Sequence, residues 1–207
     1  MMKLNTRQRA WIVAAVTIML IMAVGIGGMV SGLSEGTTRL EWRNLPPSFR
    51  HPFGTDWLGR DMFARTIQGL SFSIRVGLVG ALASTVIAAI LGLTAAVIGK
   101  AADRIISWLI DLFLSVPHLV LLILIAFVCG GGAKGIIIGV ALTHWPSLAR
   151  VIRAEALQLM TAEYVAVSRQ LGKSRLHIAL RHAAPHLLPQ LLVGFLLLFP
   201  HTILHEA

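Results

Sequence analysis

The stretch VGLVGALASTVIAAILGLTAAVIG, residues Val76–Gly99, decides the fold class because it carries no charged side chain over more than the length of a membrane crossing. A transmembrane helix needs about 20 predominantly apolar residues. Three further runs meet this requirement, and a shorter fourth run is flanked by basic residues that can reach the interface. The further runs are Trp11–Val30, Leu112–Ala133, Ala183–Leu204 and the shorter Gly135–Ala149. The sequence therefore predicts an all-α fold, a polytopic transmembrane helical bundle with about five spans.

The composition excludes most classes of soluble protein. Of the 207 residues, 56% are hydrophobic and 13% are charged, and the mean hydropathy is +0.79. Soluble domains carry roughly 25% charged residues, and a globule of this size cannot bury so much apolar surface. The single cysteine, Cys129, also excludes a disulfide scaffold. We therefore expect a chain embedded in a lipid bilayer.

The basic residues are distributed as in a membrane protein, and not as in a nucleic-acid-binding one. The formal net charge is +9, but Lys and Arg lie in short segments between the apolar runs. If the N-terminus is cytoplasmic, eleven of the 18 basic residues lie inside, and most of the other seven lie in one long external loop, where the positive-inside rule counts least. We expect a multi-pass inner (plasma) membrane protein with a cytoplasmic N-terminus and no nucleic-acid partner.

Two features of the spans leave alternatives open. Ala23-Val24-Gly25 imitates a signal-peptide cleavage site, although the apolar run continues to Val30 and favours an uncleaved anchor. In the second run small residues recur at four-residue spacing, either because neighbouring helices approach closely there or because such helices are rich in Gly and Ala. These pairs are Gly77 and Ala81, Ala88 and Gly92, and Gly92 and Ala96.

The segment Glu155–His182 is too polar to cross a bilayer but has apolar residues at helical spacing. They recur at intervals of three and four: Leu157, Met160, Tyr164, Val167 and Leu171. This pattern predicts an amphipathic helix, with Thr161 as its N-cap and Gly172 at the C′ position. Such a helix either docks into the groove of a partner or lies in the lipid headgroup layer, and the pattern alone leaves both open.

Two longer motifs carry the functional signal. The first is EYVAVSRQLG at Glu163–Gly172, followed by RHAAP at residues 181–185, and the second is HPFGTDWLGRD at His51–Asp61. The first resembles the "EAA" loop, and the second the external-loop signature, of binding-protein-dependent ABC importer permeases of the dipeptide, oligopeptide and nickel branch. Ser168 stands where that family usually has alanine. The resemblance runs from about residue 45 to the end and implies the MetI-like, type I ABC permease fold.

The resemblance implies a permease subunit that is not an enzyme and that forms the translocation path for peptides, nickel or a metal chelate. The implied partners are a second permease subunit, two cytoplasmic ATP-binding subunits and an external solute-binding protein. The residues implied to couple the chain to the ATPase are Glu163, Tyr164, Ala166, Ser168, Arg169, Leu171, Gly172 and Pro185. Those of the external motif are Gly54, Thr55, Asp56, Leu58, Gly59, Arg60 and Asp61. No cofactor is expected in the chain, because Leu171–Ser174 only imitates the end of a phosphate-binding loop and Val167 replaces its first glycine.

Three regions follow from the spans and motifs. Residues 1–33 are expected to form an N-terminal anchor helix, 34–71 an external loop, and 72–207 the permease domain. The domain is expected to contain spans at about 74–99, 108–133, 134–150 and 184–205 and a cytoplasmic coupling loop at 150–183. The family implies a further final span, which the sequence lacks, so a truncated and non-functional fragment remains an alternative.

The eight histidines support another alternative function, a membrane-embedded metal-binding protein or enzyme. His182 and His186 are four residues apart, as are His201 and His205, so each pair could bind a metal from one helix face. About 22 Å of helix separates the two pairs, so they are not expected to share a site. His201 and His205 are the candidate metal ligands, suited to nickel or a metal chelate, whereas interfacial placement is the competing interpretation. Packing or capping roles are expected for His118 and His144.

Overall fold

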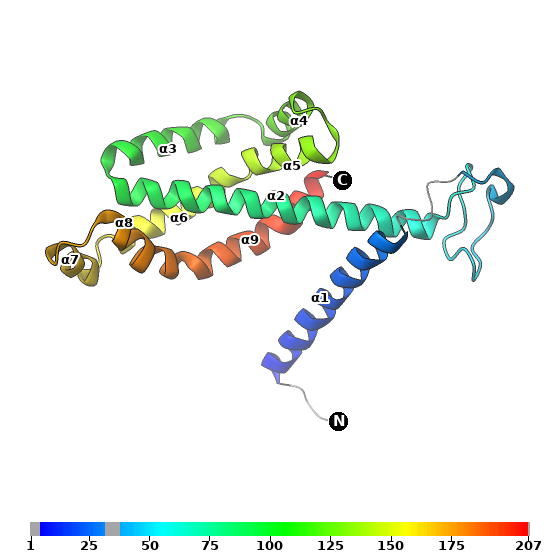
Figure 1. Cartoon of the computed structure of the whole chain (residues 1–207), viewed down its shortest axis with the longest axis horizontal. Coiled ribbons are helices and arrows are strands. Elements are labelled where there is room, and N and C mark those ends of the chain that lie inside the picture. Colours follow the sequence, from blue (N-terminus) through cyan, green and yellow to red (C-terminus); the bar gives the residue numbers. More distant parts are fainter. Residues whose placement is uncertain (1–4, 32–37, 207) are drawn as a thin grey trace. The chain divides into compact units, whose positions relative to one another are not determined.

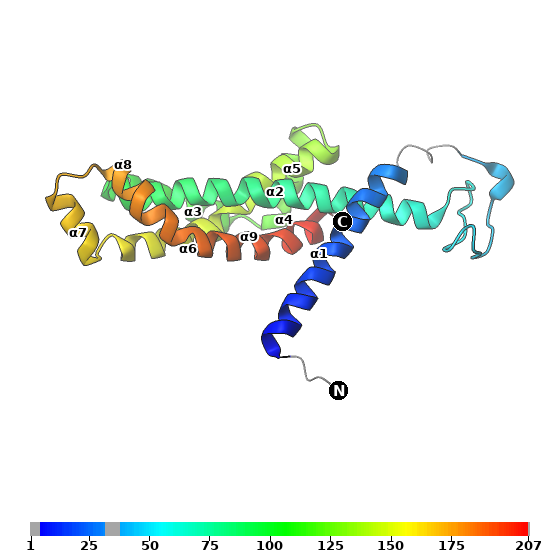
Figure 2. The ribbon, with the colours of Figure 1, turned by 60° about the horizontal axis from the view of Figure 1, so that its bottom comes forward.

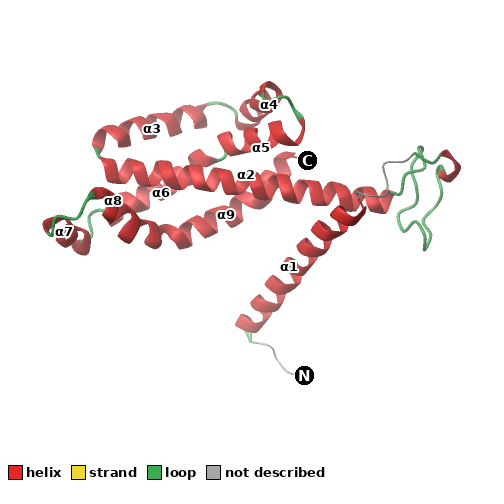
Figure 3. Cartoon of the chain, in the orientation of Figure 1, coloured by secondary structure: helices red, strands yellow, loops and turns green. Residues whose placement is uncertain are grey.

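Helices form the regular elements of residues 5–31 and 38–206, the part of the chain that the computed structural model describes, and this part contains no β-strand (Figure 3). The longer helices are α1 (Thr6–Ser31), α2 (Met62–Ile98), α3 (Lys100–Ser115), α4 (His118–Val128), α5 (Gly132–Thr143), α6 (Trp145–Leu159) and α9 (Ala184–Glu206). The shorter elements are a 3₁₀ turn (Leu40–Trp42), α7 (Glu163–Gln170), α8 (Arg175–Ile178) and a π-helical turn (Ala179–Ala183). The all-α prediction is confirmed. The predicted junction of anchor and external loop, at residues 33 and 34, lies outside the described residues.

The described residues contain four or five candidate membrane spans. Four helical segments are long and apolar enough to cross a bilayer: Thr6–Gly28, Met62–Ile98, Gly132–Leu159 and Arg175–His205. Helices α3 and α4 pass the same test together, and they count as a fifth span if the pair is one broken crossing. The polytopic bundle expected from the apolar runs is confirmed.

The span expected over Leu112–Ala133 is not one continuous helix. Helices α3 and α4 are bent by 95° at a break between Ser115 and His118. Pro117 has no N–H to donate and forces the preceding residue out of helical conformation, and Val116 is extended with φ −91° and ψ 138°. Helix α4 then packs against α5, where a β-carbon at Gly135 would meet the carbonyl of Ala126.

Helix α6 continues to Leu159, past the end expected for this span at Ala149. Arg150, which was expected to flank this span, and Arg153 both lie against acidic residues of α3. Arg153 donates to both carboxylate oxygens of Asp103, at 2.5 and 2.9 Å, and Arg150 lies 2.6 Å from a carboxylate oxygen of Asp111. These two ion pairs connect the middle of α6 to α3.

Residues Val76–Ala207 form one of two compact units, the other being Met1–Arg75. The core of the Val76–Ala207 unit is apolar and includes the fully buried Ala88, Ile152 and Leu187. Small residues of α2 lie where it meets other helices: a β-carbon at Gly92 would be 2.8 Å from Ile152, and one at Gly80 would be 2.7 Å from Val140. Close helix approach therefore explains the small-residue pattern of α2.

Within the Val76–Ala207 unit, α7 and the end of α9 lie at opposite ends (Figures 1 and 2). The chain passes from α6 into α7, returns through α8 and the π-helical turn, and then enters α9. The turn between α4 and α5 and the last residues of α9 lie at the other end (Figure 1).

Candidate functional site

Helix α7 is a separate, capped helix. A C″-to-C3 bond runs from the N–H of Lys173 to the carbonyl of Ser168 at 3.1 Å, and a C′-to-C2 bond from the N–H of Gly172 to the carbonyl of Arg169 at 3.0 Å. Together these bonds form a Schellman motif, and Gly172 has the left-handed φ of +74° that this motif requires. The predicted C′ role of Gly172 is confirmed.

The N-terminal part of the amphipathic pattern was misjudged. The N-cap of α7 is Ala162, and the hydroxyl of Thr161 donates instead to the carbonyl of Gln158, so the predicted N-cap is wrong. Leu157 belongs to α6 and Met160 to the turn that follows it, so the predicted helix is divided between two elements. Apolar residues can recur at intervals of three and four even where a turn divides the segment into two helices, so their spacing did not reveal the division.

Helix α7 and its C-cap expose three large apolar side chains. Leu171 is 73% exposed, Val167 is 52% exposed and Tyr164 is 47% exposed. The neighbouring residues Glu163, Ala166, Arg169 and Gly172, which were predicted to couple the chain to an ATPase, are exposed as well. Exposed apolar side chains that lie together on a polar segment mark a surface for a partner.

The inner face of α7 is fixed to the segment that leads into α9. Val165 is fully buried, and the hydroxyl of Ser168 lies 3.1 Å from Nε2 of His182. The rings of Tyr164 and His182 are 5.6 Å apart. Pro185 lies in the first turn of α9, where it was expected. The loop is therefore a packed element and not a free linker.

A basic recess lies beside α7. It has a volume of about 410 Å³, and its lining includes Gly99 just after α2 and the three cationic side chains of Arg169, Lys173 and Arg175. The guanidinium of Arg175 donates to the carbonyl of Ile98 and so caps the end of α2. Among the described residues, none of these three cations forms an ion pair. The recess is suited to an acidic group of another molecule.

The motif at His51–Asp61, predicted to lie in an external loop, forms one ordered turn in front of α2 with Asp56 at its centre. One carboxylate oxygen of Asp56 accepts the N–H groups of Leu58 and Arg60, each at 2.9 Å, and the other accepts from the guanidinium groups of Arg60 and Arg65 at 2.8 and 3.0 Å. Desolvation raises the pKa of this carboxyl, but the bonds from Arg60 and Leu58 outweigh it and lower the pKa from 3.8 to about 2. Asp56 is therefore a charged centre that shapes the turn.

The other members of the motif fit the same turn. Gly54 has φ +69° and Gly59 has φ +74°, and a β-carbon at Gly59 would overlap the carbonyl oxygen of Arg39. The hydroxyl oxygen of Thr55 accepts the N–H of Leu45 at 2.9 Å. These residue types are required by the backbone path and the hydrogen bonds of the turn.

Asp61 joins the turn to α2. One of its carboxylate oxygens accepts the N–H of Ala64 at 3.0 Å, which caps the helix, and the other lies 2.6 Å from Nδ1 of His51. Desolvation raises the pKa of Asp61, but the bonds from His51, Ala64 and Phe63 lower it overall below the ordinary value of 3.8. All seven predicted motif residues thus lie in one structural feature, whose role in folding the loop accounts for their types.

The histidines are arranged as the spacing suggested, with one addition. His182 lies beside α7, whereas His201 and His205 lie near the end of α9, so the two pairs are separate as expected. His144 occupies the expected capping position between α5 and α6. The sequence did not indicate that His118 and His144 also lie beside His201 and His205, because the break at Pro117 decides that contact.

Comparison with known proteins agrees with the helical architecture. Residues 85–207 match the family described as "Binding-protein-dependent transport system inner membrane component". The oligopeptide transport system permease protein OppC of Bacillus subtilis (strain 168) is 33% identical over 207 residues, which cover 100% of this chain and 68% of OppC.

Two further relatives are more similar over shorter stretches. The dipeptide transport system permease protein DppC of Bacillus subtilis (strain 168) is 35% identical over 187 residues, or 90% of this chain and 58% of DppC. A putative peptide permease protein of Brucella abortus biovar 1 (strain 9-941) is 37% identical over 164 residues, or 79% of this chain and 54% of that protein. The chain thus spans between about half and two thirds of the length of these relatives. It belongs to the family of inner membrane components of binding-protein-dependent transport systems.

Proposed function

We propose that this chain is a permease subunit of an ABC importer that carries peptides across the inner membrane. The solute is suggested by the relatives, which are named as oligopeptide, dipeptide and peptide permeases. In this proposal α1 anchors the chain with its N-terminus in the cytoplasm, and a second permease subunit completes the path. Two ATP-binding subunits lie on the cytoplasmic side and a solute-binding protein on the outer side.

The observation that carries the proposal is the exposure of Tyr164, Val167 and Leu171 on a short helix whose inner face is packed. The three cations that border the recess beside α7 form no ion pair among the described residues, so the recess can receive an acidic group of a partner. An apolar patch beside a basic recess fits a protein groove with acidic residues at its rim. We assign this groove to the ATPase.

The contacts of α7 suit it to transmit movement. Ser168 is hydrogen-bonded to His182 on the way to α9, and Arg175 of α8, which directly follows the turn after α7, is bonded to the end of α2. A force on α7 therefore reaches two membrane-spanning helices through short contacts and not through a slack loop. If ATP binding opens the translocation path alternately to each side of the membrane, the ATPase must contact α7 differently in the two conformational states of the transporter.

The external turn has a separate role in the proposal. Asp56 and Asp61 hold it in one shape directly before α2, with Phe53 and Trp57 exposed on it by 55% and 64%. We assign this turn to the side on which the solute-binding protein delivers its cargo.

The test is a pair of leucine truncations measured in peptide uptake. Leu171 and Leu204 are both highly exposed, at 73% and 76%, but only Leu171 belongs to the coupling loop. In vesicles that contain the chain with its sister permease, ATPase and binding protein, we expect Leu171→Ala to lower ATP-driven peptide uptake at least fivefold. Leu204→Ala should leave it within twofold, with equal amounts of both variants in the membrane. Equal uptake by the two variants would contradict the assignment of α7, and no uptake of any peptide by the unmodified complex would contradict the solute class.

A further inference from the structure

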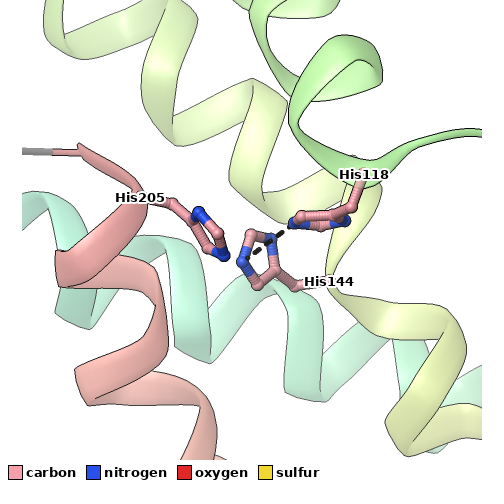
Figure 4. Close-up of side chains that lie close together, drawn as sticks. All are labelled: His118, His144 and His205. Carbon is pink, nitrogen blue, oxygen red and sulfur yellow. Dashed lines mark hydrogen bonds between the residues drawn. The ribbon is translucent and has the colours of Figure 1, made fainter.

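Four histidine side chains from three segments meet at the end of the Val76–Ala207 unit opposite α7. His118 is the first residue of α4, His144 joins α5 to α6, and His201 and His205 lie one turn apart on α9. Every two of the four rings have centroids between 4.4 and 6.4 Å apart. Figure 4 shows three of them, His118, His144 and His205, turned toward one another.

The nitrogen atoms of the cluster are spaced like ligands of one ion. Nε2 of His118 lies 3.3 Å from Nε2 of His144, and Nε2 of His205 lies 3.1 Å from Nε2 of His201. One nitrogen each from His118, His144 and His205 lie within 4.8 Å of one another. Zinc–imidazole bonds of about 2.0–2.1 Å place two tetrahedral ligands about 3.3 Å apart. Small side-chain adjustments would therefore bring three or four nitrogens onto one ion.

The hydrogen bonds of His144 leave its inward nitrogen free to bind. Its Nδ1 lies 3.2 Å from the carbonyl oxygen of Val140 and 3.1 Å from the hydroxyl of Thr143, which itself donates to the carbonyl of Gly139. Since the carbonyl oxygen only accepts, Nδ1 carries the proton and Nε2 presents its lone pair to His118. A metal-bound histidine is typically oriented in this way, by a hydrogen bond from its second nitrogen to a carbonyl.

The donor set points to one class of ion. His118, His144 and His205 each offer an imidazole nitrogen to this group, and His201 adds a fourth beside His205. Calcium and magnesium prefer oxygen ligands, whereas imidazole suits zinc, nickel and copper. We propose that His118, His144, His205 and His201 form a binding site for a divalent transition-metal ion, with zinc or nickel as its occupant. The ion would join α4, the α5–α6 junction and α9.

The site is tested by metal binding to the purified 207-residue chain in detergent, with an affinity tag that contains no histidine. Zn²⁺ and Ni²⁺ are measured separately by equilibrium dialysis. We expect one ion per chain, and X-ray absorption of the zinc-loaded protein should give three or four nitrogen neighbours at about 2.0–2.1 Å. The double variant His201→Gln with His205→Gln and the single variant His118→Gln should each weaken binding at least tenfold.

A matched control separates the cluster from binding by histidine in general. His186 lies on the same helix as His201 and His205 and is exposed, but it is not a member of the cluster. His186→Gln should bind zinc like the unmodified chain. Because His201 is exposed and His205 only half-buried, their double variant should keep the circular dichroism spectrum of the unmodified chain. Weak binding that all variants share, or no binding by the unmodified chain, would overturn the proposal, whereas the peptide-uptake test would be unaffected by either result.

Discussion

The packing of α2 against α6 can be tested by adding a single methyl group. A β-carbon at Gly92 would lie 2.8 Å from Cγ2 and 2.9 Å from Cβ of Ile152, and 3.1 Å from the backbone nitrogen of Arg153. Ordinary contact begins at 3.4 Å, so the two helices would have to separate by about 0.6 Å. Ile152 is fully buried and two of the three contacts involve Cβ or the backbone, so a rotamer change cannot relieve the overlap.

The expected cost follows from comparison with a second glycine on the same helix. Gly69→Ala adds the same methyl group where no atom of the described residues lies within 4 Å. Both substitutions gain about 1 kcal/mol of helix propensity, and overpacking costs Gly92→Ala about 1–3 kcal/mol in addition. Gly92→Ala should therefore be about 1–3 kcal/mol less stable than Gly69→Ala.

The assay is equilibrium unfolding in mixed detergent and SDS micelles, followed by far-ultraviolet circular dichroism. The difference between the two variants is the measured quantity, since the propensity gain cancels in it. If Gly92→Ala and Gly69→Ala unfold at the same SDS fraction, the close approach of α2 and α6 is refuted.

Three further predictions follow from particular contacts. Asp103 and Arg153 form an ion pair with two hydrogen bonds, and their side chains are 26% and 25% exposed. A double-mutant cycle with Asp103→Asn and Arg153→Gln should therefore give a coupling free energy of about 1–3 kcal/mol. Additive effects of the two substitutions in the unfolding assay would contradict the pair. Gly172 has φ +74°, a conformation that costs a residue with a side chain about 1–2 kcal/mol. At unchanged membrane levels, peptide uptake should therefore fall partly in Gly172→Ala and be lost in Gly172→Pro, which also lacks the backbone N–H. Normal uptake by Gly172→Pro would disprove the coupling role. The pKa of Asp56 is lowered to about 2, so its stabilisation of the turn is present above the ordinary pKa of about 4 and is lost as the pH falls toward 2. In hydrogen exchange, corrected for intrinsic rates, the amides of Leu58 and Arg60 should stay protected at pH 4 and lose protection near pH 2. Loss of protection already at pH 6 would exclude this role of Asp56.

The spans were largely readable from the sequence because a bilayer imposes length and polarity on each crossing. The uncharged run at Val76–Gly99 lies within α2 apart from its last residue, and the run at Ala183–Leu204 lies almost wholly in α9. The sequence shows Pro117 but does not predict the 95° bend there, because tertiary packing decides whether a proline kinks a helix or ends it. The pairing of Arg150 and Arg153 with Asp111 and Asp103 could not be predicted, because the partners lie 39 and 50 residues apart in the sequence.

The candidate site was readable in part for similar reasons. Gly172 could be placed because a left-handed C′ position has a strong residue preference. The N-cap could not, because Thr161 and Ala162 are adjacent and the side chain of Thr161 bonds backward to Gln158. The meeting of His118 and His144 with the histidines of α9 depends on how three helices pack, and no local pattern in the sequence encodes it.

The most direct test of the coupling role is a photo-crosslink from α7 in the assembled transporter. A benzoyl-phenylalanine placed at Leu171, which is 73% exposed, reports what covers that side chain, and the same group at Leu204 serves as the control. We expect the Leu171 position to yield a covalent product with the ATP-binding subunit, and the Leu204 position to yield none. Products with phospholipid alone from the Leu171 position would contradict the proposal that α7 receives the movement of an ATPase.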